Sequence, residues 1–168
     1  LKTLRRDQGA VYVISSDIDK FKQFNDVYGH LAGDKVIRAY AKILKNSVKR
    51  QGDYAGRNGG EEFLVILKNA GESDAVATVK KIQDQVRALS VPLGEGRCVQ
   101  FTVSFGVAGY RLAGQTAEFS EPFNETTLMN RLLEESDQAL YCSKRAGRDR
   151  YTVHFGEEKI RSMQNNSV

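Results

Sequence analysis

Two acidic sites on separate stretches of the chain have the residue types to hold a hard metal ion. Asp17 ends a β-branched run that is typical of a strand, and Glu61 and Glu62 follow the pair Gly59 and Gly60. Glycines permit a tight turn and let a ligand approach the backbone. If the strand after this turn pairs antiparallel with the first, Asp17 lies beside Glu61. Such carboxylates repel each other unless a cation lies between them, and oxygen ligands without His or Cys suit Mg²⁺ with substrate phosphates. A solvated acidic turn is the alternative.

The segment after Asp17 has side chains that suit a nucleotide. Backbone N–H groups at a helix start bind anions, and Lys22 adds positive charge there. Asn25 and Asp34 are a polar pair, and carboxylate oxygens accept from the paired N1–H and amine donors of guanine, which adenine lacks. Taken singly, these residues are explained as well by two helix caps and a surface lysine.

Lys144 and Arg148 are the basic residues best spaced to hold a triphosphate. They lie one helical turn apart near the end of a long predicted helix. The alternative is a basic helix C-terminus that the helix dipole favours.

Hydrophobic periodicity predicts the elements that must position these residues. Strands are expected over 10–17, 63–67, 98–108 and 151–155, and helices over 20–28, 34–49, 74–89 and 128–145, with Asp34 as an N-cap. The alternation over 98–108 predicts a half-buried strand of an antiparallel or mixed sheet. The order β-α-α-β-α-β-α-β predicts a sheet covered by helices on one or both faces, of ferredoxin-like or palm type.

Together, the three segments resemble the GGDEF family of diguanylate cyclases in order, spacing and chemistry. The resemblance rests on DIDKFKQFNDVYGHLAGD over 17–34, on GGEEF over 59–63 and on SDQALYCSKRAGRD over 136–149. It covers about residues 10–155 and implies an α+β fold of nucleotidyl-cyclase type, ferredoxin-like or palm-like. The central sheet of that fold is mainly antiparallel and is flanked by helices.

The resemblance also implies a role for each matching residue. Asp17 and Glu61 would be catalytic ligands of Mg²⁺, with Mn²⁺ as an alternative ion, and the Ile18 carbonyl would help. Glu62 would lie near the attacking 3′-hydroxyl and assist its deprotonation. The implied substrate-binding residues are Asn25 and Asp34 for guanine, Lys22, Lys144 and Arg148 for phosphates, and Gly59 and Gly60 for close approach.

The implied reaction is two nucleotidyl transfers that join two GTP molecules into cyclic di-GMP and release two pyrophosphates. One domain holds one GTP, so two domains must face each other across a twofold axis as a homodimer. The stretch from Arg50 to Asp53 reads RxxD and resembles a product-inhibition site. Arg50 can fork onto a phosphate or a guanine edge, and Asp53 can accept from guanine N1–H. A helix end followed by a turn is the alternative there.

Three other functions remain open. The first is a catalytically silent GGDEF-like module that binds GTP or cyclic di-GMP as a sensor, although a retired site would tolerate loss of the acidic and basic residues that are present. The second is a cyclase with another product, such as cyclic AMP-GMP, and Asp34 argues for guanine. The third is a nucleic-acid-binding domain resting on residues 144–150, for which no aromatic stacking stripe or recognition motif exists.

Bulk composition agrees with one globular domain over residues 1–168. The 168 residues carry a net charge of +4, and the two cysteines, Cys98 and Cys142, have neither zinc-site nor disulfide spacing. Leu1 and Leu4 predict the tail of a helix that begins upstream, so a sensor or linker is expected outside this chain. The resemblance implies a cytoplasmic location, free or as part of a membrane-anchored sensor protein. Residues 109–127 resemble an insertion.

Overall fold

A five-stranded, mainly antiparallel sheet forms the centre of the chain. The computed structural model describes residues 10–111 and 124–154. The strand order is β2-β3-β1-β6-β7, formed by β1 (Ala10–Ile18), β2 (Tyr54–Gly59), β3 (Glu62–Lys68), β6 (Val103–Arg111) and β7 (Tyr151–Val153). Only β7 runs parallel to its neighbour, β6. The predicted α+β fold with a mainly antiparallel sheet is therefore confirmed.

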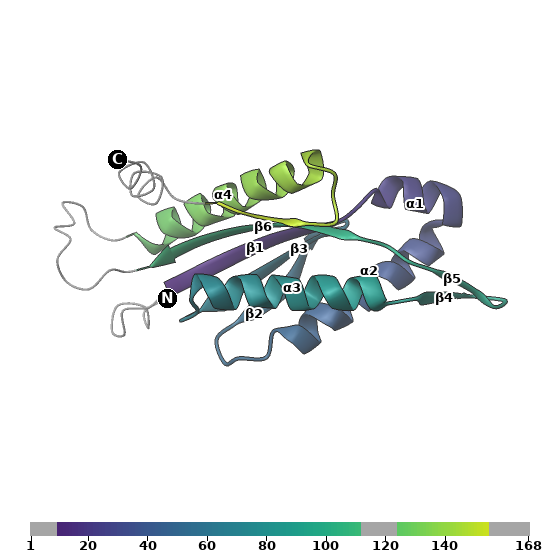
Figure 1. Cartoon of the computed structure of the whole chain (residues 1–168), viewed down its shortest axis with the longest axis horizontal. Coiled ribbons are helices and arrows are strands. Elements are labelled where there is room, and N and C mark those ends of the chain that lie inside the picture. The colour runs from purple at the N-terminus through teal and green to yellow at the C-terminus, as the bar shows by residue number, and fades with distance from the viewer. Residues whose placement is uncertain (1–9, 112–123, 155–168) are drawn as a thin grey trace, which may run out of the picture.

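Helices cover both faces of this sheet (Figure 1). The helix α4 (Glu125–Arg145) lies on one face, and α2 (His30–Ser47) and α3 (Glu72–Ala88) lie on the other. The short helix α1 (Phe21–Tyr28) follows β1 directly. A separate hairpin of β4 (Val91–Gly94) and β5 (Arg97–Val99) projects beyond the sheet on the same side as α1. None of the helices in the described ranges is both long and apolar enough to span a membrane.

The alternation of side chains along β1 divides the interior into two cores. Ile14 and Ile18 belong to the core that packs against α2 and α3. Val11 and Val13 belong to the smaller core beneath α4, which includes Leu132. Because successive strand residues point to opposite faces, Asp17 points to the same face as Val11 and Val13. The strand therefore carries this carboxylate to the α4 side of the sheet.

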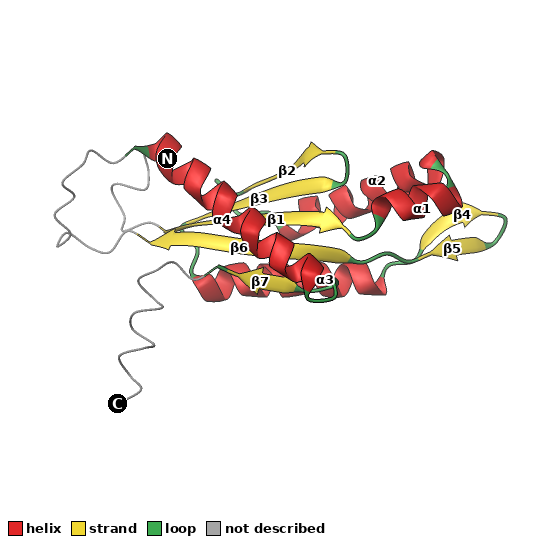
Figure 2. Ribbon diagram, turned by 90° about the horizontal axis from the view of Figure 1, so that it is seen from above, coloured by secondary structure: helices red, strands yellow, loops and turns green. Residues whose placement is uncertain are grey.

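At Gly106, α4 approaches the sheet with backbone against backbone. A Cβ added to Gly106 of β6 would overlap the carbonyl oxygen of Ser136 and the backbone nitrogen of Leu140. Figure 2 shows α4 crossing above β1 and β6 in this region. The absence of a side chain here lets the C-terminal half of α4 lie directly on the central strands.

Three sequence-based expectations differ from the structure. The second helix begins at His30, because Gly29, with φ of 83°, alone separates α1 from α2, so Asp34 is not an N-cap. The predicted strand over 98–108 is two strands, β5 and β6, and β6 is covered on both faces because α4 packs on its second side. Strands β2 and β4 were not predicted. The upstream helix and residues 112–123 of the expected insertion lie outside the described residues.

We expect Gly106→Ala to lower the free energy of unfolding by about 2–3 kcal/mol, since an added methyl must push α4 off the sheet. Urea denaturation measures this. The control is Gly71→Ala, where φ is −84° and the nearest side-chain atoms stand 3.6 Å from an added Cβ. That change should cost about 1 kcal/mol or less. If both variants lose the same free energy of unfolding, α4 can shift away from the sheet without cost and the prediction is wrong.

Candidate functional site

The α4 face of the sheet carries an ion pair between a buried acid and a half-buried lysine where β1 ends. Asp17 is 7% exposed, and the Nζ atom of Lys144 lies 2.8 Å from its Oδ2 atom. Lys144 is in the last turn of α4. The pair thus joins an acid from the central strand to a base from a helix far along the chain.

Glu62, rather than Glu61, is the residue directly opposite Asp17. The antiparallel pairing of the two strands is as predicted, but the register differs by one residue. Glu61 lies at the turn just before β3, where its carbonyl oxygen accepts a hydrogen bond of 3.3 Å from the Ile18 backbone N–H. The structure therefore does bring Asp17, Ile18 and both glutamates to one place.

Burial raises the pKa of Asp17 above its ordinary value of 3.8. The hydrogen bond and the positive charge of Lys144 act in the opposite direction, while the negative charges of Glu61 and Glu62 raise the pKa further. The ionised form of Asp17 is thus stabilised mainly by Lys144. Any further cation near these carboxylates would favour ionisation in the same way.

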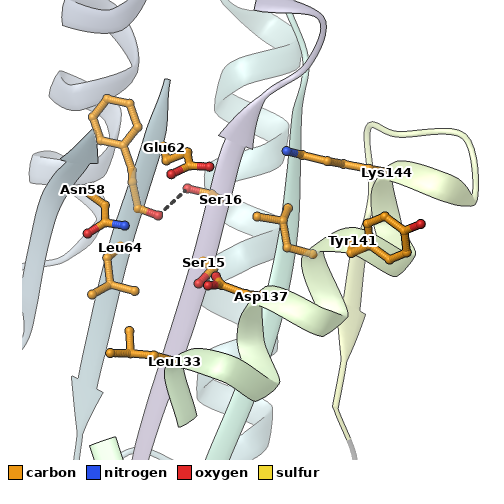
Figure 3. A pocket seen from close by; sticks show the side chains of 11 residues that line it. Ser15, Ser16, Asn58, Glu62, Leu64, Leu133, Asp137, Tyr141 and Lys144 are labelled. Atoms are coloured by element: carbon orange, nitrogen blue, oxygen red, sulfur yellow. Dashed lines mark hydrogen bonds between the residues drawn. The ribbon is translucent and has the colours of Figure 1, made fainter. Parts of the chain in front are cut away.

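A cavity of about 230 Å³ opens beside this ion pair. Figure 3 shows side chains from β1, β3 and α4 around it, with Glu62 beside Ser16 and with Lys144 extending from α4 toward the strands. The polar side chains of the lining are Ser15, Ser16, Asn58, Glu62, Asp137, Tyr141 and Lys144. Five of these, Ser15, Ser16, Asn58, Asp137 and Tyr141, carried no predicted role, because nothing in their sequence spacing sets them apart from ordinary strand and helix residues.

Buried hydroxyl groups fix the strands and helices beneath the cavity. Tyr40 of α2 donates to the Ser16 Oγ atom at 2.8 Å, and Ser16 donates to the carbonyl oxygen of Phe63 at 3.3 Å. On the α4 side, the hydroxyls of Ser15 and Ser136 share a hydrogen bond of 2.8 Å. Burial also raises the pKa of Tyr40, so its hydroxyl stays protonated as a donor.

Asp19 is a second acidic residue that carried no predicted role. Its carboxylate accepts hydrogen bonds from the hydroxyls of Thr102 at 2.7 Å and Ser104 at 2.6 Å. Its backbone N–H donates to the Thr102 carbonyl at 2.9 Å. Asp19 therefore fixes the chain that follows Asp17 against β6. The sequence offers only its nearness to Asp17 as a signal.

Asn25 and Asp34 lie together where α1 meets α2. The Asn25 side chain packs directly over Gly33, and its Oδ1 atom is buried without a hydrogen-bond partner in the described part of the chain. Asp34 follows Gly33 and is exposed. The exposed carboxylate of Asp34 suits a ligand that presents hydrogen-bond donors, and the Asn25 Oδ1 atom is an unpartnered acceptor inside the same junction.

The remaining predicted substrate residues are exposed around the same end of the sheet. No atom lies within 4 Å of a Cβ added to Gly59 or Gly60, so a ligand can approach the backbone of the turn before Glu61. Lys22 lies in the first turn of α1. Arg148 follows α4 with a left-handed φ of 62°.

Arg50 and Asp53 belong to a different cavity, on the α2 and α3 side of the sheet. This cavity has a volume of about 270 Å³, and Lys49, Arg50, Asp53, Asp74, Thr78 and Lys81 are among its lining residues. Asp53 accepts a hydrogen bond of 2.9 Å from the Lys68 backbone. Arg50 lies 3.8 Å from Asp74, and both side chains are well exposed. The guanidinium of Arg50 is thus only loosely held.

The donor set at Asp17 suits a magnesium ion that arrives with its ligand. Within the described ranges, no three His, Cys, Asp or Glu side chains are gathered so as to hold a metal by themselves. Mg²⁺ is commonly held by only one or two carboxylates, with phosphate oxygens and water completing its shell. Two carboxylates and a backbone carbonyl, beside a cavity, fit that pattern.

Comparison with known proteins assigns this arrangement to a family. A family model for the diguanylate cyclase GGDEF domain matches residues 1–150. Diguanylate cyclase A of Treponema denticola is 39% identical over 141 residues, which are 84% of this chain and 34% of that protein. The chain thus spans about a third of this relative's length.

Two solved structures share the fold. The GGDEF domain of DgcB from Caulobacter crescentus, in complex with c-di-GMP, has a TM-score of 0.75 and 30% identity, covering 91% of this chain and 82% of that one. The active GGEEF domain of a diguanylate cyclase from Vibrio cholerae has a TM-score of 0.75 and 27% identity, covering 93% and 90%.

We expect Asp17→Asn to stabilise the metal-free protein progressively as the pH rises from about 3.8 toward neutrality. Because the folded pKa is raised, the folded state holds the proton more tightly, and ionisation of Asp17 lowers stability with rising pH. Asn imitates the protonated acid at every pH and lacks this loss. Urea denaturation across the pH range, with EDTA present, measures the difference.

The control for this prediction is Asp84→Asn, which removes one negative charge from an exposed position on α3. Its stability should remain at a constant offset from that of the parent chain. If the free energy of unfolding of Asp17→Asn instead falls relative to that of the parent chain as the pH rises, the effect of Lys144 on the Asp17 pKa outweighs that of burial.

Proposed function

The chain belongs to the diguanylate cyclase GGDEF family, and we propose that it condenses two molecules of GTP into cyclic di-GMP and two of pyrophosphate. One observation carries the proposal. A buried carboxylate, Asp17, lies opposite Glu62 and is paired with Lys144 at the edge of a cavity. Carboxylates able to hold a metal ion beside a basic side chain suit the transfer of a phosphoryl group, in which negative charge must be stabilised.

Asp17, the Ile18 carbonyl and Glu61 are the proposed ligands of Mg²⁺, with Mn²⁺ as an alternative. When bound, the metal neutralises charge on the phosphate oxygens and orients them. The hydrogen bond between Ile18 and Glu61 supports this set, because it holds the two backbones in contact. The raised pKa of Asp17 supports it as well, since a carboxylate short of positive charge has most to gain from a cation.

Glu62 is the proposed general base. It is exposed on the cavity side of β3, where a 3′-hydroxyl can reach it. The hydroxyl gives its proton to Glu62 and its oxygen forms a bond to the α-phosphorus of the second GTP. The bond from that phosphorus to the pyrophosphate oxygen breaks, and the pyrophosphate leaves with its electron pair.

Lys144, Arg148 and Lys22 are the proposed partners of the phosphates. The Lys144 Nζ atom lies 2.8 Å from the Asp17 carboxylate. A triphosphate offers Lys144 a stronger anion nearby, so that the lysine can change partner by a rotation of its flexible side chain. Gly59 and Gly60 leave the space beside these groups open.

Asn25 and Asp34 are proposed to select guanine. The unpartnered Oδ1 atom of Asn25 and the exposed carboxylate of Asp34 are both acceptors. Guanine presents N1–H and an exocyclic amine on one edge, whereas adenine presents no such pair. Two acceptors at one junction therefore favour guanine.

The active form is proposed to be a homodimer, in the cytoplasm where GTP is available. The described residues form a cavity beside Asp17 that we assign to one GTP, and cyclisation needs two GTP molecules with each 3′-hydroxyl facing the other's α-phosphate. A twofold axis between two chains meets this requirement.

Product inhibition is proposed to act through the second cavity, around Arg50 and Asp53. Its lining carries the basic side chains of Lys49, Arg50 and Lys81 together with Asp53. The weak contact between Arg50 and Asp74, at 3.8 Å, leaves the guanidinium available for a phosphate or a guanine edge.

The purified chain, at high concentration with GTP and Mg²⁺, should form cyclic di-GMP, and Glu62→Gln should slow this by about 10²–10⁴-fold because the base is lost. Chromatography resolves the product. The rate per chain should rise with protein concentration as dimers form. Glu134→Gln, at an exposed position on α4, should leave the rate unchanged. Binding of GTP without product at any concentration would favour the sensor function.

Arg50→Ala should raise the cyclic di-GMP concentration needed for half inhibition by about tenfold or more, because a charge-assisted hydrogen bond is lost. The initial rate without product should stay the same. Arg38→Ala, at an exposed position on α2, is the matched control. An unchanged inhibition curve for Arg50→Ala would place the inhibitory site elsewhere.

A further inference from the structure

The segment that carries Arg148 has an unusual backbone. Gly147, Arg148 and Asp149 have φ values of 113°, 62° and 47°, so three successive residues lie in the left-handed region. Glycine adopts this region freely, but the other two residues do so only when their surroundings hold them there. The orientation of the Arg148 side chain therefore depends on the contacts that hold Asp149 in this conformation.

Asp149 is held by α3 through both its side chain and its backbone. The Arg87 Nε atom lies 3.0 and 3.1 Å from the two carboxylate oxygens of Asp149, and the Arg87 Nη2 atom donates to its carbonyl at 3.0 Å. Gln83, which is buried, donates to the same carbonyl at 2.7 Å. Three donors from one helix face thus converge on a single residue.

The backbone N–H of Asp149 is held from the other side, by the end of β1. It donates to the Oδ2 atom of Asp19 at 3.0 Å, and the same carboxylate accepts from Thr102 and Ser104 of the β6 region. Asp19 lies two residues after Asp17. One carboxylate therefore fixes the distance between the end of β1 and the turn that carries Arg148.

We propose that Asp19 and Arg87 are positioning residues for Arg148, acting through Asp149 to aim its guanidinium at the phosphates of the bound nucleotide. This inference rests on the proposed function, since it assigns Arg148 a triphosphate partner. Arg148 is exposed, and among the described residues its backbone N–H donates to the Ser143 carbonyl while its own carbonyl accepts from the Arg150 side chain, both near the end of α4. Two neighbours of Arg148 tie this turn to the rest of the protein: Asp149 through the contacts above, and Arg150, whose carbonyl accepts a hydrogen bond of 2.9 Å from the Phe105 backbone N–H.

The test measures binding rather than turnover, with a GTP analogue whose α,β-bridging oxygen is replaced by a methylene group. Arg87→Ala should weaken binding of the analogue about tenfold and leave binding of guanosine, which has no phosphate, unchanged. Magnetic resonance titration detects both ligands. The control is Arg97→Ala, which removes an exposed arginine 3.5 Å from Glu95 on the β4–β5 hairpin. It should alter neither affinity.

A double-mutant cycle shows whether Arg87 acts through Arg148. In an Arg148→Ala background, Arg87→Ala should cause no further loss of analogue binding. Equal losses in both backgrounds, or a matching loss of guanosine binding, would overturn the inference. Asp149→Asn keeps the backbone groups and should reproduce part of the loss, and it replaces Arg87→Ala if that variant folds poorly. If the parent chain itself fails to bind the analogue, the proposed function falls and this inference falls with it.

Discussion

The charge of Asp17 constrains the arrangement of the α4 face. A carboxylate at 7% exposure is costly to ionise unless a cation reaches it. The cation comes from Lys144, which is separated from Asp17 by most of the sheet and by α4 in the sequence. The ion pair forms only if α4 lies at the correct height and angle over β1. The hydrogen bond between Ser15 and Ser136 and the contact at Gly106 hold the helix there. The cavity, Glu62 and the basic end of α4 all depend on this placement.

The sequence predicted the elements with strong periodicity and the residues in motifs, and it missed features that depend on packing. The four main helices and β1 follow from apolar spacing, and the GGEEF turn places two glutamates by Asp17. The register of β1 against β3 was wrong by one residue because apolar spacing does not determine where the turn after Gly60 ends and β3 begins. Strand β2 was missed because its residues are mostly exposed and include two glycines. Asp19 was missed because its partners come from distant segments.

The two cavities lie on opposite faces of the sheet but share the strand β3. Residues 62–64 of β3 line the cavity beside Asp17, while Leu67 of the same strand lines the cavity around Arg50. Helix α3 supplies Thr78 and Lys81 to the second cavity, and Gln83 and Arg87, further along it, bind Asp149. The same helix thus lines the second cavity and holds the turn that contains Asp149.

The contact at Gly106 sets the height of α4 by backbone atoms rather than by the size of any side chain. Most helix–sheet distances are determined by the volumes of the residues between the layers, and they drift when those residues are exchanged. Here the closest approach involves a carbonyl, an amide and a glycine, which almost every amino-acid substitution elsewhere leaves unaltered. Descendants of this sequence can therefore replace much of the apolar interior while Lys144 stays within reach of Asp17. The distance between Lys144 and Asp17 therefore depends little on which apolar side chains fill the interior.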